Sequence, residues 1–391
     1  MMIESIKLRD FRNYEELTLK PHPGVNILFG QNGSGKTNLL EAVHYCALGR
    51  SHRTSIDREV VRKGMPMAAC GVQVRRENGR IDVAVKLTPG ESRKKQVFVE
   101  RKRAQRLSDL MGNLQCVIFS PEDLMLVKDG PAIRRRFLDM LLSQLSTGYF
   151  LALQQYHKAL EQRNAILRDV KRGGRCENGM LDAFEEAMAI PCQTLIPMRR
   201  RVLAELAEYA GQKYCAISGR ETEQFGMRYV GCLREDGQIV SRVRDALRQG
   251  RHEDMIKGAT GFGVHREDIA LTLSGRDMKL FASQGQIRTA ALSMKLAQME
   301  VFRRETGETP VLLLDDVMSE LDMTRRTSLL REMSGVQTFI TCTDESDLEG
   351  CREKRSYQVF LSQEGSARVR EISQGEGIPS QPDFQEDPEL Q

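Results

Sequence analysis

Residues 30–37 read Gly-Gln-Asn-Gly-Ser-Gly-Lys-Thr, which matches the pattern G-x-x-x-x-G-K-[ST]. The five residues before this loop are β-branched, aromatic or otherwise mostly apolar, which predicts a buried strand, and residues 38–48 carry apolar side chains at helical spacing. A strand, a glycine loop and a helix N-terminus together form a nest of backbone N–H groups that binds phosphate oxygens. The stretch therefore predicts a nucleoside triphosphate site in an α/β protein.

Each part of this loop has an expected role. Lys36 is expected to reach the β- and γ-phosphates as a catalytic residue, and the Thr37 hydroxyl is expected to hold Mg²⁺. The turn at Arg12 and Asn13 precedes the loop closely, so these residues either only make the turn or lie beside the nucleotide. The expected nucleotide contacts of the loop are Gly30, Gln31, Asn32, Gly33, Ser34, Gly35, Lys36, Thr37 and Asn38.

Composition narrows the class of protein. The chain of 391 residues is long enough for two or three domains. No apolar run approaches the ~18 residues of a membrane span and the N-terminus lacks a signal-peptide pattern, so we expect no membrane partner. Nine scattered cysteines without a C-x-x-C pair indicate reduced thiols and a cytoplasmic location. The net charge of +4 is mild, so a nucleic-acid surface requires local clustering.

A second group of polar residues follows in the last third of the chain. Residues 311–314 are apolar and end in Asp315 and Asp316, as in a buried parallel strand that presents carboxylates at its C-terminal end. We expect Asp315 to act through the hydration shell of Mg²⁺, and Asp316, as the catalytic acid, to position or deprotonate the attacking water. Residues 338–342 predict the neighbouring strand.

The middle of the chain changes character near residue 121. Residues 132–145, 149–170 and 181–217 have helical spacing, and Pro191 and Pro197 are expected to kink or break the last segment. The arginine triplets 134–136 and 199–201 are interpreted as solvated helix faces. We therefore expect a mainly helical insertion over 121–259, placed inside a split head formed by residues 1–120 and 260–372.

Residues 93–106 form a predicted basic hairpin. Seven cations, Arg93, Lys94, Lys95, Arg101, Lys102, Arg103 and Arg106, accompany the single acid Glu100. The hairpin is either a solvated edge strand that resists aggregation or a surface for the phosphate backbone of DNA.

In this order the elements resemble the head of ABC-type ATPases, with mixed sheets, a Walker A loop, a signature turn at residues 283–286, a Walker B strand and a D-loop at residues 319–322. More closely, the chain resembles the RecF family of bacterial DNA replication and repair proteins over residues 2–362. The blocks that carry this resemblance are residues 11–14, 32–42, 119–123, 135–139, 162–164, 265–268, 283–289 and 319–322.

The resemblance implies how the parts act together. It implies an ATP-dependent homodimer joined head to tail, in which the signature turn of one subunit closes on the γ-phosphate held by Lys36 of the other. It also implies binding of duplex DNA and single-strand gap junctions, release on hydrolysis by a weak DNA-stimulated ATPase, and help to RecO and RecR in loading RecA. The residues it adds to the nucleotide site are Ser283, Gln284, Gly285, Gln286 and Asp322.

Other classes of ATPase fit this sequence less well, and one DNA-binding class fits it equally. A transporter ATPase needs a membrane partner and usually a switch histidine, whereas the strand at 338–342 ends in Thr341, Cys342 and Thr343. A long SMC-type coiled coil does not fit in the about 160 residues between Ser120 and Ser283, which have no sustained heptad repeat. A nucleotide-gated DNA clamp with negligible turnover stays open, because Asp316 is one methylene shorter than the glutamate of most ABC heads.

The C-terminal residues 373–391 form an acidic tail that is expected to be disordered, with five acids, no base and three prolines. The alternatives are an inert solubilising tail, a shield over a basic surface and a segment that binds a partner.

Overall fold

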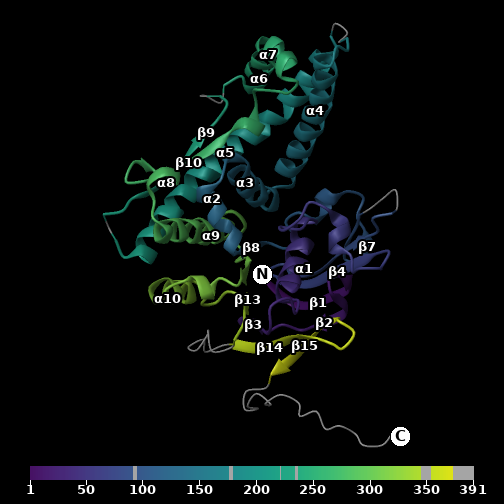
Figure 1. Cartoon of the computed structure of the whole chain (residues 1–391), viewed down its shortest axis with the longest axis vertical. Coiled ribbons are helices and arrows are strands. Elements are labelled where there is room, and N and C mark those ends of the chain that lie inside the picture. The colour runs from purple at the N-terminus through teal and green to yellow at the C-terminus, as the bar shows by residue number, and fades with distance from the viewer. Residues whose placement is uncertain (91–94, 176–178, 221, 234–236, 345–353, 373–391) are drawn as a thin grey trace, which may run out of the picture.

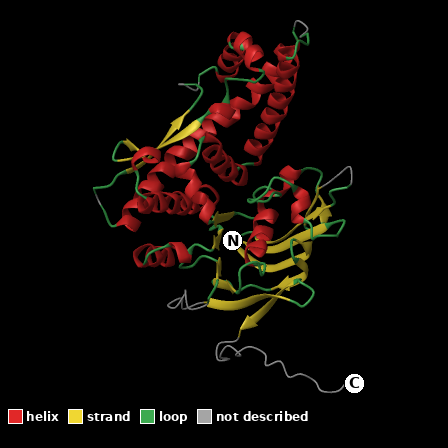
Figure 2. Ribbon diagram, in the orientation of Figure 1, coloured by secondary structure: helices red, strands yellow, loops and turns green. Residues whose placement is uncertain are grey.

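The computed structural model describes residues 1–90, 95–175, 179–220, 222–233, 237–344 and 354–372. The acidic tail at 373–391 and two cations of the basic hairpin, Arg93 and Lys94, lie outside the described residues. The described chain forms a lower part built on two large sheets and an upper part built mainly of helices (Figures 1 and 2).

The first large sheet is antiparallel and has the strand order β2-β1-β4-β5-β6-β7. Its strands alternate buried and more exposed residues, because one face packs on the core and the other faces outward. The strands are β1 Met2–Phe11, β2 Tyr14–Leu19, β4 Ala68–Arg76, β5 Gly79–Leu87, β6 Lys95–Val99 and β7 Lys102–Arg103.

The second large sheet is mixed and has the order β15-β14-β3-β13-β12-β8. Its parallel strands β3, β12 and β13 are buried along their whole length, because both faces are covered. The strands predicted at 25–29, 311–315 and 338–342 are confirmed. The six strands are β3 Val25–Phe29, β8 Cys116–Phe119, β12 Val311–Asp315, β13 Thr338–Cys342, β14 Lys354–Leu361 and β15 Ala367–Ile372.

Helix α1, Lys36–Leu48, lies between the two large sheets and is buried almost all round. One hydrophobic core joins α1 to the antiparallel sheet and to one face of the mixed sheet, through residues such as Leu28 and Leu313. A second core joins the opposite face of the mixed sheet to the helical part, through residues such as Ile27 and Leu314. The helical part is thus packed directly on the sheet that carries the phosphate loop.

The helical part also contains a small antiparallel sheet of order β11-β10-β9, with β9 Phe225–Val230, β10 Asp268–Leu273 and β11 Arg276–Asp277. The longest helix, α5, packs on both α4 and α9. The remaining helices of the described chain are α2 Met125–Lys128, α3 Pro131–Leu145, α4 Thr147–Lys171, α5 Met180–Ser218, α6 Ile239–Gln249, α7 Arg251–Lys257, α8 Met278–Phe281, α9 Gln284–Thr306 and α10 Met323–Glu332.

Helix α5 runs without interruption through Pro191 and Pro197, so these prolines do not break it, and the expected kink stays a prediction. A proline removes one backbone hydrogen bond and crowds the preceding turn. Helix α5 is packed between α4 and α9 and buries Leu195, Ile196 and Leu203. The burial of these side chains in the packed helix offsets the lost backbone hydrogen bonds and the steric crowding at Pro191 and Pro197.

The interpretation of the arginine triplets as solvated faces is wrong for the first arginine of each, Arg134 and Arg199. Arg199 is buried and donates hydrogen bonds to Asp139 at 2.7 Å, Glu267 at 2.6 Å and the Tyr149 hydroxyl at 2.8 Å. Arg134 is also buried, with a two-bond contact to Asp268 at 2.7 and 2.9 Å. Buried guanidinium groups are kept charged by such partners. These two arginines hold α3, α5 and the small sheet together, and neither is available to DNA.

Candidate functional site

The phosphate loop joins β3 to α1 and needs glycine at both of its ends. Gly30 has φ +147°, and a Cβ added there would lie 2.1 Å from the Val359 carbonyl oxygen of β14. Gly35 has φ +117°, and a Cβ there would lie 2.8 Å from Oδ1 of Asn13. Because neither position leaves room for a side chain, the loop is clamped between β14 and the β1–β2 turn.

Lys36 is folded over this loop. Its ammonium donates hydrogen bonds to the carbonyl oxygens of Gly30 and, at 3.0 Å, Gln31. Burial lowers the pKa of Lys36, and the nearby Asp316 and Asp315 oppose that shift. Gln31, Asn32 and Gly33 form the exposed tip of the loop. The Lys36 ammonium is therefore held inside the loop, where it can contact a phosphate group bound by the loop.

The structure brings Thr37 and Asp315 together from positions 278 residues apart. The Thr37 hydroxyl donates to Oδ1 of Asp315 at 2.7 Å, and the Thr341 hydroxyl donates to the same oxygen at 2.8 Å. Burial raises the pKa of Asp315, although the two hydroxyl groups oppose the shift. A buried carboxylate beside a threonine hydroxyl supplies the hard oxygen ligands that suit Mg²⁺.

Asp316 leaves the strand with a left-handed backbone, at φ +52°. Its N–H donates to the Thr341 hydroxyl at 2.8 Å, and its carbonyl accepts from Ser319 at 2.9 Å. A non-glycine residue in this region is uncommon and is retained where the surroundings fix it. Here the turn separates the two carboxylates, so that Asp315 stays buried and Asp316 is exposed.

These side chains line a cavity of about 270 Å³. The chain's residues fit a bound triphosphate with its Mg²⁺, because a lysine, two oxygen ligands and an exposed carboxylate converge there. In the same loop but outside this cavity, Ser34 has a buried hydroxyl oxygen without a hydrogen-bond partner in the described part of the chain. Sequence reasoning missed the roles of Arg53 and Thr341 in this site. The lining residues are Asn32, Gly33, Gly35, Lys36, Thr37, Asn38, Arg53, Asp316 and Thr341.

Arg12 and Asn13 lie behind the loop. Arg12 donates to both carboxylate oxygens of the buried Glu41 on α1, from Nε at 2.8 Å and Nη2 at 2.6 Å. Burial favours the neutral form of Glu41, but hydrogen bonds from Arg12 and Ser51 prevail and lower its pKa. The Asn13 amide donates to the Ser34 carbonyl at 3.2 Å and accepts from the Asn38 amide at 2.8 Å. Within the chain both residues therefore brace the loop and α1.

The signature turn lies in a different place. Ser283 caps α9 and, with Gln286, forms a capping box. The turn lines a second cavity, of about 250 Å³, together with Asp322 and Arg325. Sequence reasoning missed Arg325, which donates to the Gly285 carbonyl at 3.1 Å and to the Thr289 hydroxyl at 2.8 Å. Gln284 and Ser283 are exposed at the start of α9.

The two halves of the expected nucleotide site thus line separate cavities within one chain. Asn32, Gly33, residues 35–38 and Asp316 line the first, with Asp315 bonded to Thr37 behind them, and Ser283, Gly285, Gln286 and Asp322 line the second. A second copy of the chain is one way in which such surfaces meet.

The basic hairpin is formed by β6 and β7, joined by a tight turn at Glu100 and Arg101 with φ +50° and +63°. Arg101, Lys102 and Arg103 are exposed. Lys95 instead turns inward, because its ammonium donates to the Gly49 carbonyl and lies 3.2 Å from Asp57.

Comparison with known proteins gives three findings. Residues 2–368 match the family model described as the RecF/RecN/SMC N-terminal domain. The chain is 37% identical over 361 residues to the DNA replication and repair protein RecF of Clostridium perfringens, covering 92% of this chain and 98% of that one. It is 39% identical over 371 residues to the protein of the same name from Lactobacillus delbrueckii subsp. bulgaricus, covering 93% and 97%.

Solved structures agree with these relatives. The structure of the recombination mediator protein RecF with ATP, from the RecFOR pathway, superposes with a TM-score of 0.85 at 33% identity, covering 95% of this chain and 98% of that one. An Smc head domain from Pyrococcus yayanosii has a TM-score of 0.54 at 12% identity, covering 95% and 97%, which shows a shared fold. The fold is therefore that of an ABC-type ATPase head, with mixed sheets and a helical part. Across the described ranges no helix combines the length and apolar character needed to cross a membrane.

Proposed function

Because this chain belongs to the RecF family of DNA replication and repair proteins, we propose that it binds ATP with Mg²⁺ at the phosphate loop and uses the nucleotide to control its hold on DNA. The observation that carries the proposal is the contact of Thr37 with Asp315 at 2.7 Å, beside Lys36 and Asp316. The Thr37–Asp315 contact joins the phosphate loop to the acidic end of a strand that is distant in the sequence, which is the arrangement that phosphoryl-transfer sites of this type require.

The roles proposed for the side chains follow from their contacts. Lys36 exchanges the carbonyls of Gly30 and Gln31 for phosphate oxygens. Thr37 and Asp315 hold the metal ion, which neutralises phosphate charge when it is bound. Asp316 is exposed, which suits a carboxylate that orients a water molecule. Thr341 fixes both acids, through the Asp315 carboxylate and the Asp316 N–H.

Turnover separates an ATPase from a clamp that binds nucleotide without hydrolysis. We expect the wild-type chain to hydrolyse ATP slowly in a single-turnover assay, faster with DNA, and Asp316→Asn to bind ATP without hydrolysis. Glu122→Gln is the matched control, since it also replaces an exposed carboxylate by an amide but lies outside both cavities. Negligible hydrolysis by the wild type, with and without DNA, would favour the clamp, whereas equal measurable rates for both proteins would remove Asp316 from its proposed role.

We further propose that ATP joins two copies head to tail, so that Ser283–Gln286 and Asp322 of one copy face the phosphate loop of the other. The proposal is supported by the two separate cavities and by the exposed signature turn. Such an interface would bury two nucleotides about one two-fold axis.

The test is sedimentation of the chain with ATP. Ser283→Arg should prevent dimerisation without weakening ATP binding by the monomer, because the added cation lies outside the chain's own phosphate loop. Ser241→Arg, on α6 and outside both cavities, should dimerise normally. A Ser283→Arg dimer of ordinary stability would contradict the head-to-tail arrangement.

The proposed DNA partners are duplexes and single-strand gap junctions, where the chain would help RecO and RecR to load RecA. The support is family membership and the exposed cations at the β6–β7 hairpin. Binding to gapped and intact duplexes, each with and without ATP, tests the preference. Equal affinity for both duplexes under all conditions would remove the gap from the proposal.

A further inference from the structure

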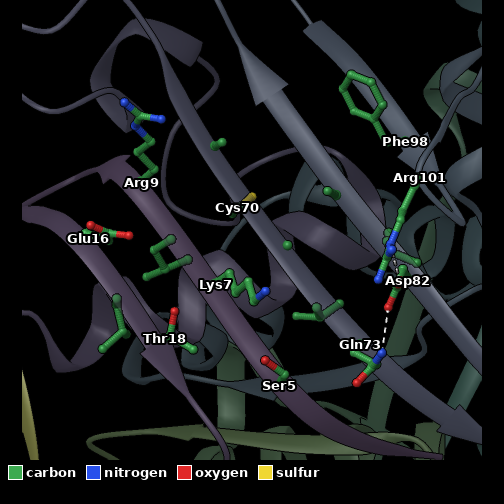
Figure 3. Close-up of a pocket in the computed structure, with 17 residues that line it drawn as sticks. Ser5, Lys7, Arg9, Glu16, Thr18, Cys70, Gln73, Asp82, Phe98 and Arg101 are labelled. Carbon is green, nitrogen blue, oxygen red and sulfur yellow. Dashed lines mark hydrogen bonds and ion pairs between the residues drawn. The ribbon is translucent and has the colours of Figure 1, made fainter.

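The outer face of the antiparallel sheet has a hollow of about 410 Å³, shown in Figure 3. The strand register explains it. Lys7, Gly71, Ala84 and Phe98 are direct neighbours on four adjacent strands and form one row across the sheet. Gly71 and Ala84 leave the middle of the row almost without side chains, so a trough forms between Lys7 and Phe98. Ala69 continues the trough in the next row, beside Arg9.

Three cations, Lys7, Arg9 and Arg101, and two acids, Glu16 and Asp82, line the trough. Lys7 and Arg9 are exposed and form no ion pair within the described chain. Arg101, at 88% side-chain exposure, lies 3.4 Å from Asp82 at one side of the trough (Figure 3). On this face the cations Lys7, Arg9, Lys86, Arg101 and Arg103 outnumber the acids Glu16 and Asp82. An occupant that fits is an acidic peptide with one bulky apolar side chain.

The chain itself contains such a peptide. Residues 373–391 carry five acids and no base, and their one aromatic residue, Phe384, stands directly after Asp383 and before Glu386 and Asp387. The chain contains no tryptophan, and Phe384 is the largest side chain of the tail.

The tail also starts in the right place. Its last described predecessor, Ile372, ends β15, which packs beside the edge strand β2. Two contacts hold the start of β15 there: the Ala367 N–H donates to the Asn13 carbonyl at 2.8 Å, and Arg368 lies 3.9 Å from Glu15. Ile372 lies five residues, about 17 Å, further along the strand. Phe384 follows Ile372 by twelve residues, which span up to about 40 Å when extended. The three strand spacings from β2 to β5 amount to about 15 Å.

We propose that the C-terminal tail docks in this trough, with the Phe384 ring over Gly71 and Ala84 and its carboxylates against Lys7 and Arg9. The trough supplies what the tail lacks, namely positive charge and an apolar floor. The interaction is held by exposed ion pairs and one aromatic anchor, so it weakens with salt. It is independent of the nucleotide site.

Phe384→Trp gives the full chain a single tryptophan, whose emission reports on docking. We expect blue-shifted emission at low salt that moves to that of the free tail peptide in high salt and in the Lys7→Glu/Arg9→Glu background. The matched control is Lys128→Glu/Arg168→Glu, which reverses two exposed cations on the helical part and should leave the emission unchanged.

A second measurement protects the test from a folding defect. A labelled peptide of residues 373–391, titrated onto the chain truncated after Ile372, should bind about tenfold more weakly to the Lys7→Glu/Arg9→Glu protein. Emission equal to that of the free peptide in every background would overturn the proposal. Unchanged peptide binding by the Lys7→Glu/Arg9→Glu protein would also overturn the proposal. If these reversals altered only self-association or DNA affinity, the trough would belong to a second copy or to DNA.

Discussion

Replacing Arg12 by alanine tests whether this residue braces the fold or contacts nucleotide. The Arg12 guanidinium holds both oxygens of Glu41, whose side chain is fully buried, and its Nη1 donates to the Glu59 carbonyl at 2.6 Å. Alanine keeps the Cβ at φ +55°, whereas glycine would relax this left-handed backbone and mask part of the loss.

The expected cost is at the low end of the range for breaking a buried ion pair, about 3 kcal/mol. Two donors to Glu41 remain after the change, the Ser51 hydroxyl and Arg53 at 3.5 Å, which limits the loss. Adding Glu41→Gln removes the buried charge, so the double variant should recover about 1–2 kcal/mol of the free energy of unfolding.

The pH dependence has a definite sign. The folded-state pKa of Glu41 lies below its ordinary value, so its contribution to stability is present above about pH 4.5 and is lost as pH falls through the folded pKa. The difference between wild type and Arg12→Ala should therefore be full at pH 7.5 and shrink in acid.

Urea unfolding followed by circular dichroism at these pH values, together with ATP titration of the folded proteins, makes the test. Lys20→Ala is the control, because Lys20 is exposed directly after β2, lies outside the trough and should change stability by less than about 0.5 kcal/mol. A stable Arg12→Ala protein whose ATP affinity falls more than tenfold would refute the bracing role and place Arg12 on the nucleotide.

Three further predictions concern the nucleotide and DNA sites. Asp315→Asn should raise the melting temperature of the ligand-free chain by about 1–3 °C at pH 8 and abolish stabilisation by Mg²⁺ with ATP. Because the pKa of Asp315 is raised in the folded chain, its ionised form lowers stability as pH rises through that pKa, so the gain in melting temperature should vanish in acid. Scanning fluorimetry that shows no gain in melting temperature at pH 8 would contradict this. Lys36→Arg should keep most ATP binding but block turnover, because a guanidinium cannot replace the compact ammonium between the Gly30 and Gln31 carbonyls; normal turnover would remove Lys36 from its proposed role. Neutralising residues 101–103 should flatten the log–log salt dependence of DNA binding by roughly 0.9 per lost phosphate contact, and an unchanged slope would move the DNA surface elsewhere.

The sequence by itself determined the local structure around the phosphate loop. The strand before the loop, the helix after it, the apolar strand that ends in Asp315 and the Ser283 cap all follow from short-range rules, namely side-chain periodicity, glycine conformation and hydrogen bonding at a helix start. Each rule acts within about one helical turn or one strand. The motifs in their order also indicated the family before any fold was known.

Only the tertiary structure decided which distant groups meet. The Asp315 oxygen that accepts from both Thr37 and Thr341, and the bracing of α1 by Arg12, depend on strand order in two different sheets. Arg199 reads as a surface residue in sequence, yet it is buried, because Asp139 and Glu267 come to it from other elements.

The trough on the antiparallel sheet depends in the same way on strand register. Gly71 and Ala84 leave a gap in the row of side chains only because the register places them next to each other. Burial and pairing energies belong to contacts between segments far apart in the chain, and short-range patterns contain no information about those contacts.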